Sequence, residues 1–378
     1  MDLDFTEEQQ MLRETVRRLC EEHTPIEAVR RLEDDPTGYP VEMWKQMGEL
    51  GILGLLISES CGGGGMSAIE GAIVYEELGR ALAPTPHFTS CVLSATAIAE
   101  AGSEEQKQQW LPGIASGESI VAPAWLEPGN SFRPEGVQMR AEPDDGGFVL
   151  SGSKLHAHFA SSAAALLVLA RTGNAAEDIG LFMVDPTAPG VELTQQLSLG
   201  SDTQYRVEFS DVRVPASARL EASGGGWAAW QAAMMRGAIL CGAQAMGGAQ
   251  RAMDITVEYA KVREQFGKPL GAFQALSHYL ADGQTHVDGG NTLVYEAAWA
   301  DSCGLPIDRL APMAKLFACQ TYRDVTAMCV QVHGGMGFTV EYDIQLFFRR
   351  AKQLQLTWWD SRHLEELVAA AVLDREAS

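Results

Sequence analysis

The chain has 378 residues and a formal net charge of −22, with 50 acidic side chains against 28 lysines and arginines. Such an acidic surface repels nucleic acid and anionic lipid headgroups, so the composition argues against a nucleic-acid or membrane partner. Hydrophobic residues make up 46% of the chain, which is typical of a globular protein, and the length suits two or three domains.

Cysteine usage and the start of the chain predict where the protein works. The seven cysteines are scattered and form no Cys-x-x-Cys pair, which is typical of reduced thiols. The first residues are acidic and lack the apolar core of a secretory signal, and no run of about 18 apolar residues predicts a membrane span. We therefore expect a cytoplasmic protein without a membrane partner.

The predicted elements change character twice along the chain. A capping box at residues 6–9 opens a helix, and further helical patterns cover residues 43–50, 68–82, 90–101 and 104–115. Short strand-like segments separated by Gly, Pro, Asp and Asn follow at 137–141, 148–151, 164–170, 179–184, 191–194 and 206–209. Helical patterns return at 227–262, 273–300, 307–332 and 361–371. This order predicts a small β domain within a helical protein that ends in a bundle.

Two motifs in the last third carry the most specific signal. The first reads REQFGKPL at 263–270 and closes a long predicted helix, and the second reads QVHGGMGF at 331–338. A guanidinium such as that of Arg263 is a natural bidentate partner for pyrophosphate, and the Gly334-Gly335 pair lets backbone amides approach a ligand. Alone, the first would fit a surface arginine and the second a tight turn between helices. Together with FQA at 273–275, they resemble the paired signatures of the acyl-CoA dehydrogenase family of flavoproteins.

The resemblance extends over nearly the whole chain, through FTEEQ at 5–9, ELGILG at 49–54, GGGGMS at 62–67, EELGR at 76–80 and FSDVRVP at 209–215. It implies an α+β fold with an N-terminal helical domain at 1–119, a middle β-barrel domain at 120–222 and a C-terminal four-helix bundle at 223–378. It also implies an FAD-dependent oxidoreductase of lipid metabolism, which dehydrogenates an acyl-CoA thioester between its α and β carbons.

In the family, the two motifs reach across a subunit interface to FAD that is bound mainly by a neighbouring chain. The resemblance therefore assigns FAD contacts to six residues of this chain: Arg263, Phe266, Gln274, Gln331, Gly334 and Gly335.

The segments that would face the flavin ring depart from the family. Where members carry a Thr-Glu-Pro-Gly-Ala-Gly-Ser-Asp segment, this chain reads LEPGNSF at 126–132, so that Leu126 replaces the hydroxyl donor. Where members carry Lys-x-Trp-Ile-Thr-Asn-Gly, it reads KLHAHFA at 154–160. His156 and His158 take the places of the Trp and the Thr, would share one face of a regular strand, and are our candidates for flavin contacts. No further ligand accompanies them, so we expect no metal site.

The base is the other departure. Dehydrogenation needs a carboxylate that removes the α-proton, and the family carries it at one of two positions. In this chain these positions hold Trp358 and Met235, and neither side chain accepts a proton. Asp360 is a candidate base after a short loop shift, although it is also placed to cap the helix that starts at residue 361. Arg236 is a candidate for substrate binding.

Three interpretations stay open. The chain is one subunit of a heteromeric enzyme and completes the FAD site of a paralogous subunit that carries the base. Alternatively, it self-associates into an ordinary dehydrogenase that uses Asp360, or it is a non-catalytic flavin-binding or structural chain. Heteromeric relatives act on acyl-CoA thioesters with bulky groups, including steroid side chains. Electron-transferring flavoprotein and oxygen are the candidate electron acceptors.

Overall fold

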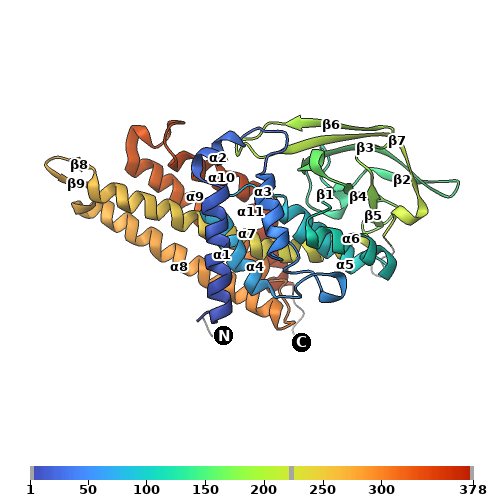
Figure 1. Cartoon of the computed structure of the whole chain (residues 1–378), viewed down its shortest axis with the longest axis horizontal. Coiled ribbons are helices and arrows are strands. Elements are labelled where there is room, and N and C mark those ends of the chain that lie inside the picture. The colour runs from blue at the N-terminus through green and yellow to red at the C-terminus, as the bar shows by residue number, and fades with distance from the viewer. Residues whose placement is uncertain (1–3, 221–224, 375–378) are drawn as a thin grey trace. The chain divides into compact units, whose positions relative to one another are not determined.

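The computed structural model (Figure 1) describes residues 4–220 and 225–374. These residues belong to two compact units. Unit 1 contains Met1–Arg30, Ser67–Ala83 and Ala238–Ser378, and unit 2 contains Arg31–Met66 and Pro84–Gly237. Within the described residues, no helix is both long enough and apolar enough to cross a bilayer.

Unit 1 is built from helices. They are α1 (Glu7–His23), most of α2 (Ile26–Arg31), α4 (Ala68–Arg80), the larger part of α7 (Gly226–Val262), α8 (Gln274–Ser302), α9 (Leu310–His333), α10 (Ile344–Leu356) and α11 (Ser361–Leu373). The predicted capping box is confirmed at the start of α1. The amide of Gln9 donates to the Thr6 hydroxyl (3.2 Å), and the Thr6 amide donates to the Gln9 side chain (3.0 Å).

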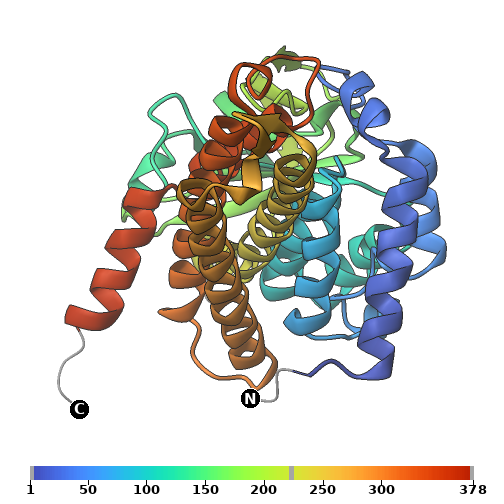
Figure 2. The same cartoon turned by 90° about the vertical axis from the view of Figure 1, so that its left-hand side faces the viewer.

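The helices of unit 1 pack closely because glycines line their crossings. α9 packs against α8, α10 and α11, and α4 packs against α1 and α8. A Cβ added to Gly79 on α4 would lie 2.0 Å from the carbonyl oxygen of Gln244 on α7, and one added to Gly247 would lie 1.8 Å from that of Glu76. Only glycine permits this backbone contact. Figure 2 shows α8 and α9 side by side in the bundle.

A short hairpin links α7 to α8. Its strands are β8 (Glu264–Gln265) and β9 (Lys268–Pro269), and it projects beyond the ends of the two helices it connects (Figure 1). The first of the two sequence motifs forms this hairpin.

Unit 2 holds a sheet and shorter helices. The helices are α3 (Val41–Glu49), α5 (Ala95–Ala101) and α6 (Glu104–Ser116). The prediction of one regular helix over residues 90–101 is wrong, because Phe88–Ser94 winds as a π-helix. The wider turn places the buried hydroxyls of Ser90 and Ser94 against one residue, Val121, whose amide and carbonyl each bond to one of them at 3.0 Å.

The sheet has seven strands: β1 (Val121–Ala124), β2 (Arg140–Asp144), β3 (Gly147–His158), β4 (Ala165–Arg171), β5 (Ile179–Val184), β6 (Val191–Gln196) and β7 (Gln204–Pro215). Their order is β1-β4-β2-β3-β7-β6, with β5 paired to β4. Leu150, Val168, Phe182 and Val207 belong to its buried core. The expected fold class is confirmed: helical N-terminal region, mixed half-barrel sheet and helical C-terminal region.

Strand boundaries differ from prediction, and β3 and β7 extend well beyond the predicted ranges of 148–151 and 206–209. Residues 137–139 are not in a strand, because a 3₁₀ turn at Pro134–Gly136 delays the start of β2 until Arg140. β1 was not predicted, because four residues with a central proline give a weak strand pattern.

Candidate functional site

Arg263 lies where α7 passes into the hairpin, with its side chain exposed. Its amide donates to the Tyr259 carbonyl (2.9 Å), and its own carbonyl accepts from the Leu270 amide (2.8 Å), which closes the base of the hairpin. Phe266 at the tip is 93% exposed and has a φ of +54°. Gln274, the first residue of α8, is also exposed. The three predicted FAD-contacting residues of this segment are therefore open to a ligand or a partner.

The second motif forms the turn after α9. Gln331, Gly334 and Gly335 are exposed, and Gly334 has a φ of +64° and a ψ of −141°. A Cβ added to either glycine would meet no atom of the described residues within 4 Å. The backbone of Gly334 and Gly335 is therefore open on the side where a side chain would project. An arginine and a primary amide, next to a glycine turn that no side chain covers, suit a pyrophosphate, so these residues fit the polar end of FAD. The Gly334 amide itself donates to the Gln331 carbonyl.

Large apolar side chains surround both motifs. Solvent exposure of such side chains around a polar donor set is typical of a protein–protein contact. The exposed apolar residues within or directly beside the two motifs are Val262, Phe266, Met336, Phe338 and Val340.

The loop at 126–130 is fixed to β3 in unit 2 by a buried ion pair. Lys154 is fully buried, and its Nζ donates to Glu127 Oε1 at 2.7 Å. Glu127 also accepts backbone amides from residues 138 and 139 at 3.0 Å. Next to the pair, the Leu155 amide donates to the Leu126 carbonyl (2.8 Å). Burial lowers the pKa of Lys154 to about 8, although the neighbouring carboxylate opposes this shift.

Both candidate flavin-contacting histidines bond to residues at or near the start of β7. His156 Nδ1 contacts Gln204 Oε1, and His158 Nε2 lies 2.7 Å from Asp202 Oδ2. Gln204 in turn donates to Asp202 Oδ1 (2.8 Å). His156 has a φ of +56°, and the pairing with β7 shifts register between residues 154 and 157. The regular alternation that we expected here is therefore interrupted, and tertiary contacts orient the two rings instead.

Asp360 caps α11. Its Oδ1 accepts the amide of His363 at 2.9 Å, and its backbone has the extended conformation of an N-cap. The capping role that the sequence allowed is thus present, and it occupies one oxygen of the carboxylate.

The turn before Asp360 is held by a buried lysine. Lys315 on α9 is fully buried, and its Nζ donates to the carbonyls of Leu354 (3.1 Å), Thr357 (3.0 Å) and Trp359 (2.8 Å). Trp358 and Trp359 have φ values of +52° and +74°. Three carbonyl contacts to one cation stabilise a backbone that these side chains disfavour.

The other predicted residues lie at the start of α7. Met235 is partly buried, and Arg236 is exposed with its Nη1 3.7 Å from Glu100 Oε1 within unit 2. Among residues 4–220 and 225–374, no group of three or more His, Cys, Asp or Glu side chains could hold a metal ion.

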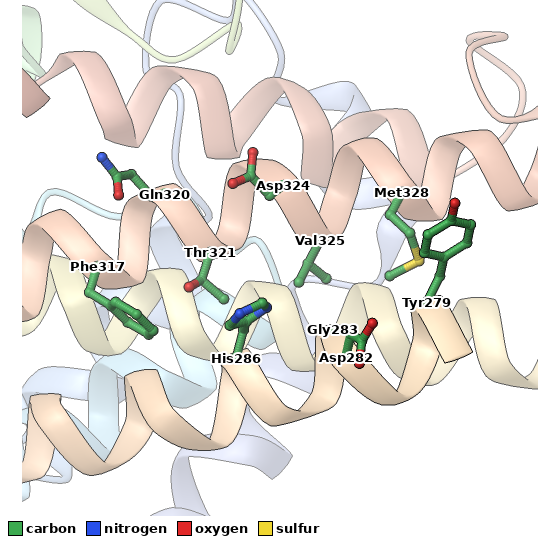
Figure 3. A pocket seen from close by; sticks show the side chains of 10 residues that line it. All are labelled: Tyr279, Asp282, Gly283, His286, Phe317, Gln320, Thr321, Asp324, Val325 and Met328. Carbon is green, nitrogen blue, oxygen red and sulfur yellow. The ribbon is translucent and has the colours of Figure 1, made fainter. Parts of the chain in front are cut away.

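Two grooves open in unit 1. One, of about 340 Å³, lies between α8 and α9, where His286 and Asp282 face Thr321 and Asp324 across it (Figure 3). The other, of about 530 Å³, is lined by residues of α1, α4 and α8, including Arg13 and Glu76. No predicted site residue lines either groove, so neither corresponds to the site that the sequence predicts.

Sequence reasoning missed three contacts that shape these segments. They are the Glu127–Lys154 pair, the carbonyl contacts of Lys315, and the stack of His333 on Tyr259. Each joins residues at least 27 positions apart, and no local pattern marks such a pairing.

The three domains of one family match this chain in order. The acyl-CoA dehydrogenase N-terminal domain matches residues 6–118, the middle domain 122–212 and the C-terminal domain 224–360. The chain therefore belongs to the acyl-CoA dehydrogenase family, which uses FAD. It is 32% identical over 365 residues to a probable acyl-CoA dehydrogenase, YngJ of Bacillus subtilis, with 94% of this chain and 95% of that protein covered.

Solved structures support the same assignment. Butyryl-CoA dehydrogenase from Megasphaera elsdenii superposes with a TM-score of 0.91 at 29% identity, with 99% of this chain and 100% of the other covered. A chain of the ChsE4–ChsE5 complex from Mycobacterium tuberculosis superposes with a TM-score of 0.89 at 28% identity, and both chains are covered completely.

Proposed function

We propose that this chain is one subunit of a heteromeric acyl-CoA dehydrogenase and completes the FAD site of a paralogous subunit. In this role Arg263, Phe266, Gln274, Gln331, Gly334 and Gly335 contact the polar end of an FAD whose ring lies in the partner. The partner supplies the base that removes the α-proton of the acyl-CoA. When bound, FAD accepts a hydride from the β-carbon of the substrate.

The observation that carries the proposal is an asymmetry between two sets of residues. The donors for the polar end of FAD are exposed and surrounded by exposed apolar side chains, as a contribution to a neighbour requires. At the two positions where the family carries its base, this chain has Met235 and Trp358, and one oxygen of the Asp360 carboxylate is already bonded as a helix cap. A chain equipped in this way can hold a cofactor but lacks a ready proton acceptor of its own.

The segments that would contact the ring of a flavin bound by this chain itself support the same division of roles between two subunits. Leu126 offers no hydroxyl, and the imidazoles of His156 and His158 are bonded to Gln204 and Asp202. We expect a ring site built in this way to hold flavin less well than a partner site with a threonine and a tryptophan. A complex should therefore contain fewer flavins than chains.

Two other functions make different predictions. In a self-associating dehydrogenase, Asp360 is the base, Arg236 binds substrate, His156 and His158 contact the flavin, and every chain carries one FAD. In a non-catalytic flavin-binding or structural chain, no partner produces turnover. The ChsE4–ChsE5 complex, a structural relative formed by two named chains, favours the heteromeric arrangement.

The deciding experiment compares the chain alone with the chain produced together with a family paralogue that carries a glutamate at a base position. The mass of each assembly and its flavin absorbance give the number of FAD per chain. We expect little FAD on the chain alone and about one FAD for every two chains in the complex. A homo-oligomer with one tightly bound FAD per chain, reducible by an acyl-CoA, would refute the proposal in favour of the Asp360 enzyme.

The source of electrons and their acceptor are tested with the same complex. Acyl-CoA thioesters from short chains to steroid side chains serve as substrates. We propose electron-transferring flavoprotein as the acceptor and the cytoplasm as the location. Flavin reoxidation by that protein should be much faster than reoxidation by air.

A further inference from the structure

His333 is the last residue of α9, directly before the Gly334 turn, and is only 3% exposed. Its Nδ1 donates to the carbonyl of Cys329 at 2.8 Å. Among the described residues, its Nε2 has no hydrogen-bond partner. Burial lowers the pKa of His333, which the bond to Cys329 only partly offsets, so the ring is neutral at physiological pH. With only one ring nitrogen hydrogen-bonded, the main contacts of this buried imidazole are those of its ring faces and edges.

These contacts join three separate segments of unit 1. The His333 ring stacks on Tyr259 of α7 with centroids 4.3 Å apart and planes 23° apart. It also contacts Tyr342, in the loop before α10, at 5.4 Å, and the two tyrosine rings meet edge to face at 6.3 Å. Each such aromatic contact stabilises the arrangement beyond the effect of the area it buries.

On one side, the stack leads directly to Arg263. Tyr259 lies one helical turn before it, and the Tyr259 carbonyl accepts the Arg263 amide at 2.9 Å. The Arg263 carbonyl then accepts the Leu270 amide at 2.8 Å and fixes the hairpin. The position of the Tyr259 backbone therefore fixes the position of the Arg263 backbone, from which the guanidinium extends.

On the other side, the stack leads to the glycine turn. Gly334 follows His333 in the chain, and its carbonyl accepts the Gly337 amide at 2.9 Å. A Cβ added to Gly337 would lie 3.0 Å from the Cβ of His333, so the turn folds back onto this side chain. Arg30 fixes the far end of the loop through the Val340 carbonyl and Asp343.

We propose that His333 is a positioning residue that holds the Arg263 segment and the Gly334-Gly335 turn in one fixed geometry, so that both can reach the same dinucleotide pyrophosphate. This inference rests on the proposed function, because it assumes that the two segments share one ligand. Its physical basis is preorganisation: when one rigid contact orders both segments before binding, less binding energy is spent on ordering them.

The test uses three variants in the complex with the partner subunit and measures FAD affinity by flavin fluorescence. His333→Leu removes the ring stack and the Nδ1 bond, and we expect about a ten-fold loss of FAD affinity with assembly retained. His333→Phe restores a stacking ring and should recover most of that loss. In an Arg263→Ala background, His333→Leu should cost clearly less than ten-fold, because the guanidinium is gone and only the Gly334-Gly335 turn still depends on His333.

The outcomes separate this inference from the function on which it rests. If Arg263→Ala leaves FAD affinity unchanged, the proposed function and this inference both fail. If Arg263→Ala weakens FAD but His333→Leu does not, only the inference fails. Losses that multiply in the double variant also overturn it, because they indicate general destabilisation. If His333→Leu does not assemble, Tyr259→Leu removes the same stack from the other side and must show the same non-additivity with Arg263→Ala.

Discussion

Replacing Lys154 by methionine should destabilise unit 2 by about 3–5 kcal/mol, the usual result of removing one partner of a buried ion pair. The lysine is fully buried, and its ammonium donates to Glu127 at 2.7 Å. Methionine fills similar space but leaves the carboxylate in the interior with only the two backbone amides of residues 138 and 139. Those two bonds stabilise the charge only in part, because the lost bond was the charge-assisted one.

The double variant Glu127→Gln with Lys154→Met should recover most of this loss. It removes both charges, while a glutamine oxygen still accepts a backbone amide. The lowered pKa of Lys154, about 8, shows that burial outweighs the attraction of Glu127 for the cation. Replacing both groups should therefore leave the free energy of unfolding within about 1 kcal/mol of the wild type, or above it.

The assay is urea unfolding followed by tryptophan fluorescence at one fixed chain concentration, with linear extrapolation to water. A matched control is Lys45→Met, because Lys45 forms an exposed pair with Glu42 at 2.7 Å, and such a pair should contribute little to stability. A loss below about 1 kcal/mol for Lys154→Met would refute the reasoning. So would a double variant as unstable as the sum of the two single variants.

Three further predictions test the cofactor site, the base and a buried histidine. Arg263→Ala should weaken FAD binding in the assembled protein by about 1.5–3 kcal/mol through loss of a charge-assisted bond, and unchanged affinity by flavin fluorescence would contradict the assignment. Asp360→Asn should leave flavin reduction in stopped flow nearly unchanged, because asparagine keeps the helix cap, whereas a collapse of the rate with normal flavin content would identify Asp360 as the base. Burial lowers the pKa of His87 to about 4. The stability that the neutral His87 ring contributes is therefore fully present above pH 6.5, and about 3 kcal/mol of the free energy of unfolding is lost as the pH falls to 4. His87→Gln should flatten that part of the urea-derived pH profile, and an unchanged slope would show that other groups cause it.

Local sequence signals predicted most of the helices because their patterns are continuous. The capping box at Thr6 and the long helical patterns of α7, α8 and α9 correspond to elements of the structure. The helix α10 was not predicted, and residues 88–94 wind as a π-helix because tertiary contacts of Ser90 and Ser94 act on them. Such contacts with distant residues leave no periodic trace in the sequence.

For the candidate site, the sequence predicted residue types more successfully than their surroundings. The exposure of Arg263 and of the Gly334 turn agrees with an intermolecular role, which itself stays a prediction. The partners of His156 and His158 lie more than 40 positions along the chain and come into contact only when β3 pairs with β7. A register shift in that pairing also cancels the alternation on which the sequence argument depended.

The turn at residues 357–359 keeps its shape independently of the side chain at position 358. A left-handed backbone costs about 1–2 kcal/mol for each residue other than glycine, and Trp358 and Trp359 both adopt it. Lys315 offsets this cost with three bonds to carbonyl oxygens, none of which depends on the side chain at position 358. The shape of the turn is therefore set by the backbone and by a buried cation, while the proton acceptor would be set only by the side chain. Because the two are physically independent, the turn and the bundle can persist with either a carboxylate or a tryptophan at position 358, as the proposed division between two subunits requires.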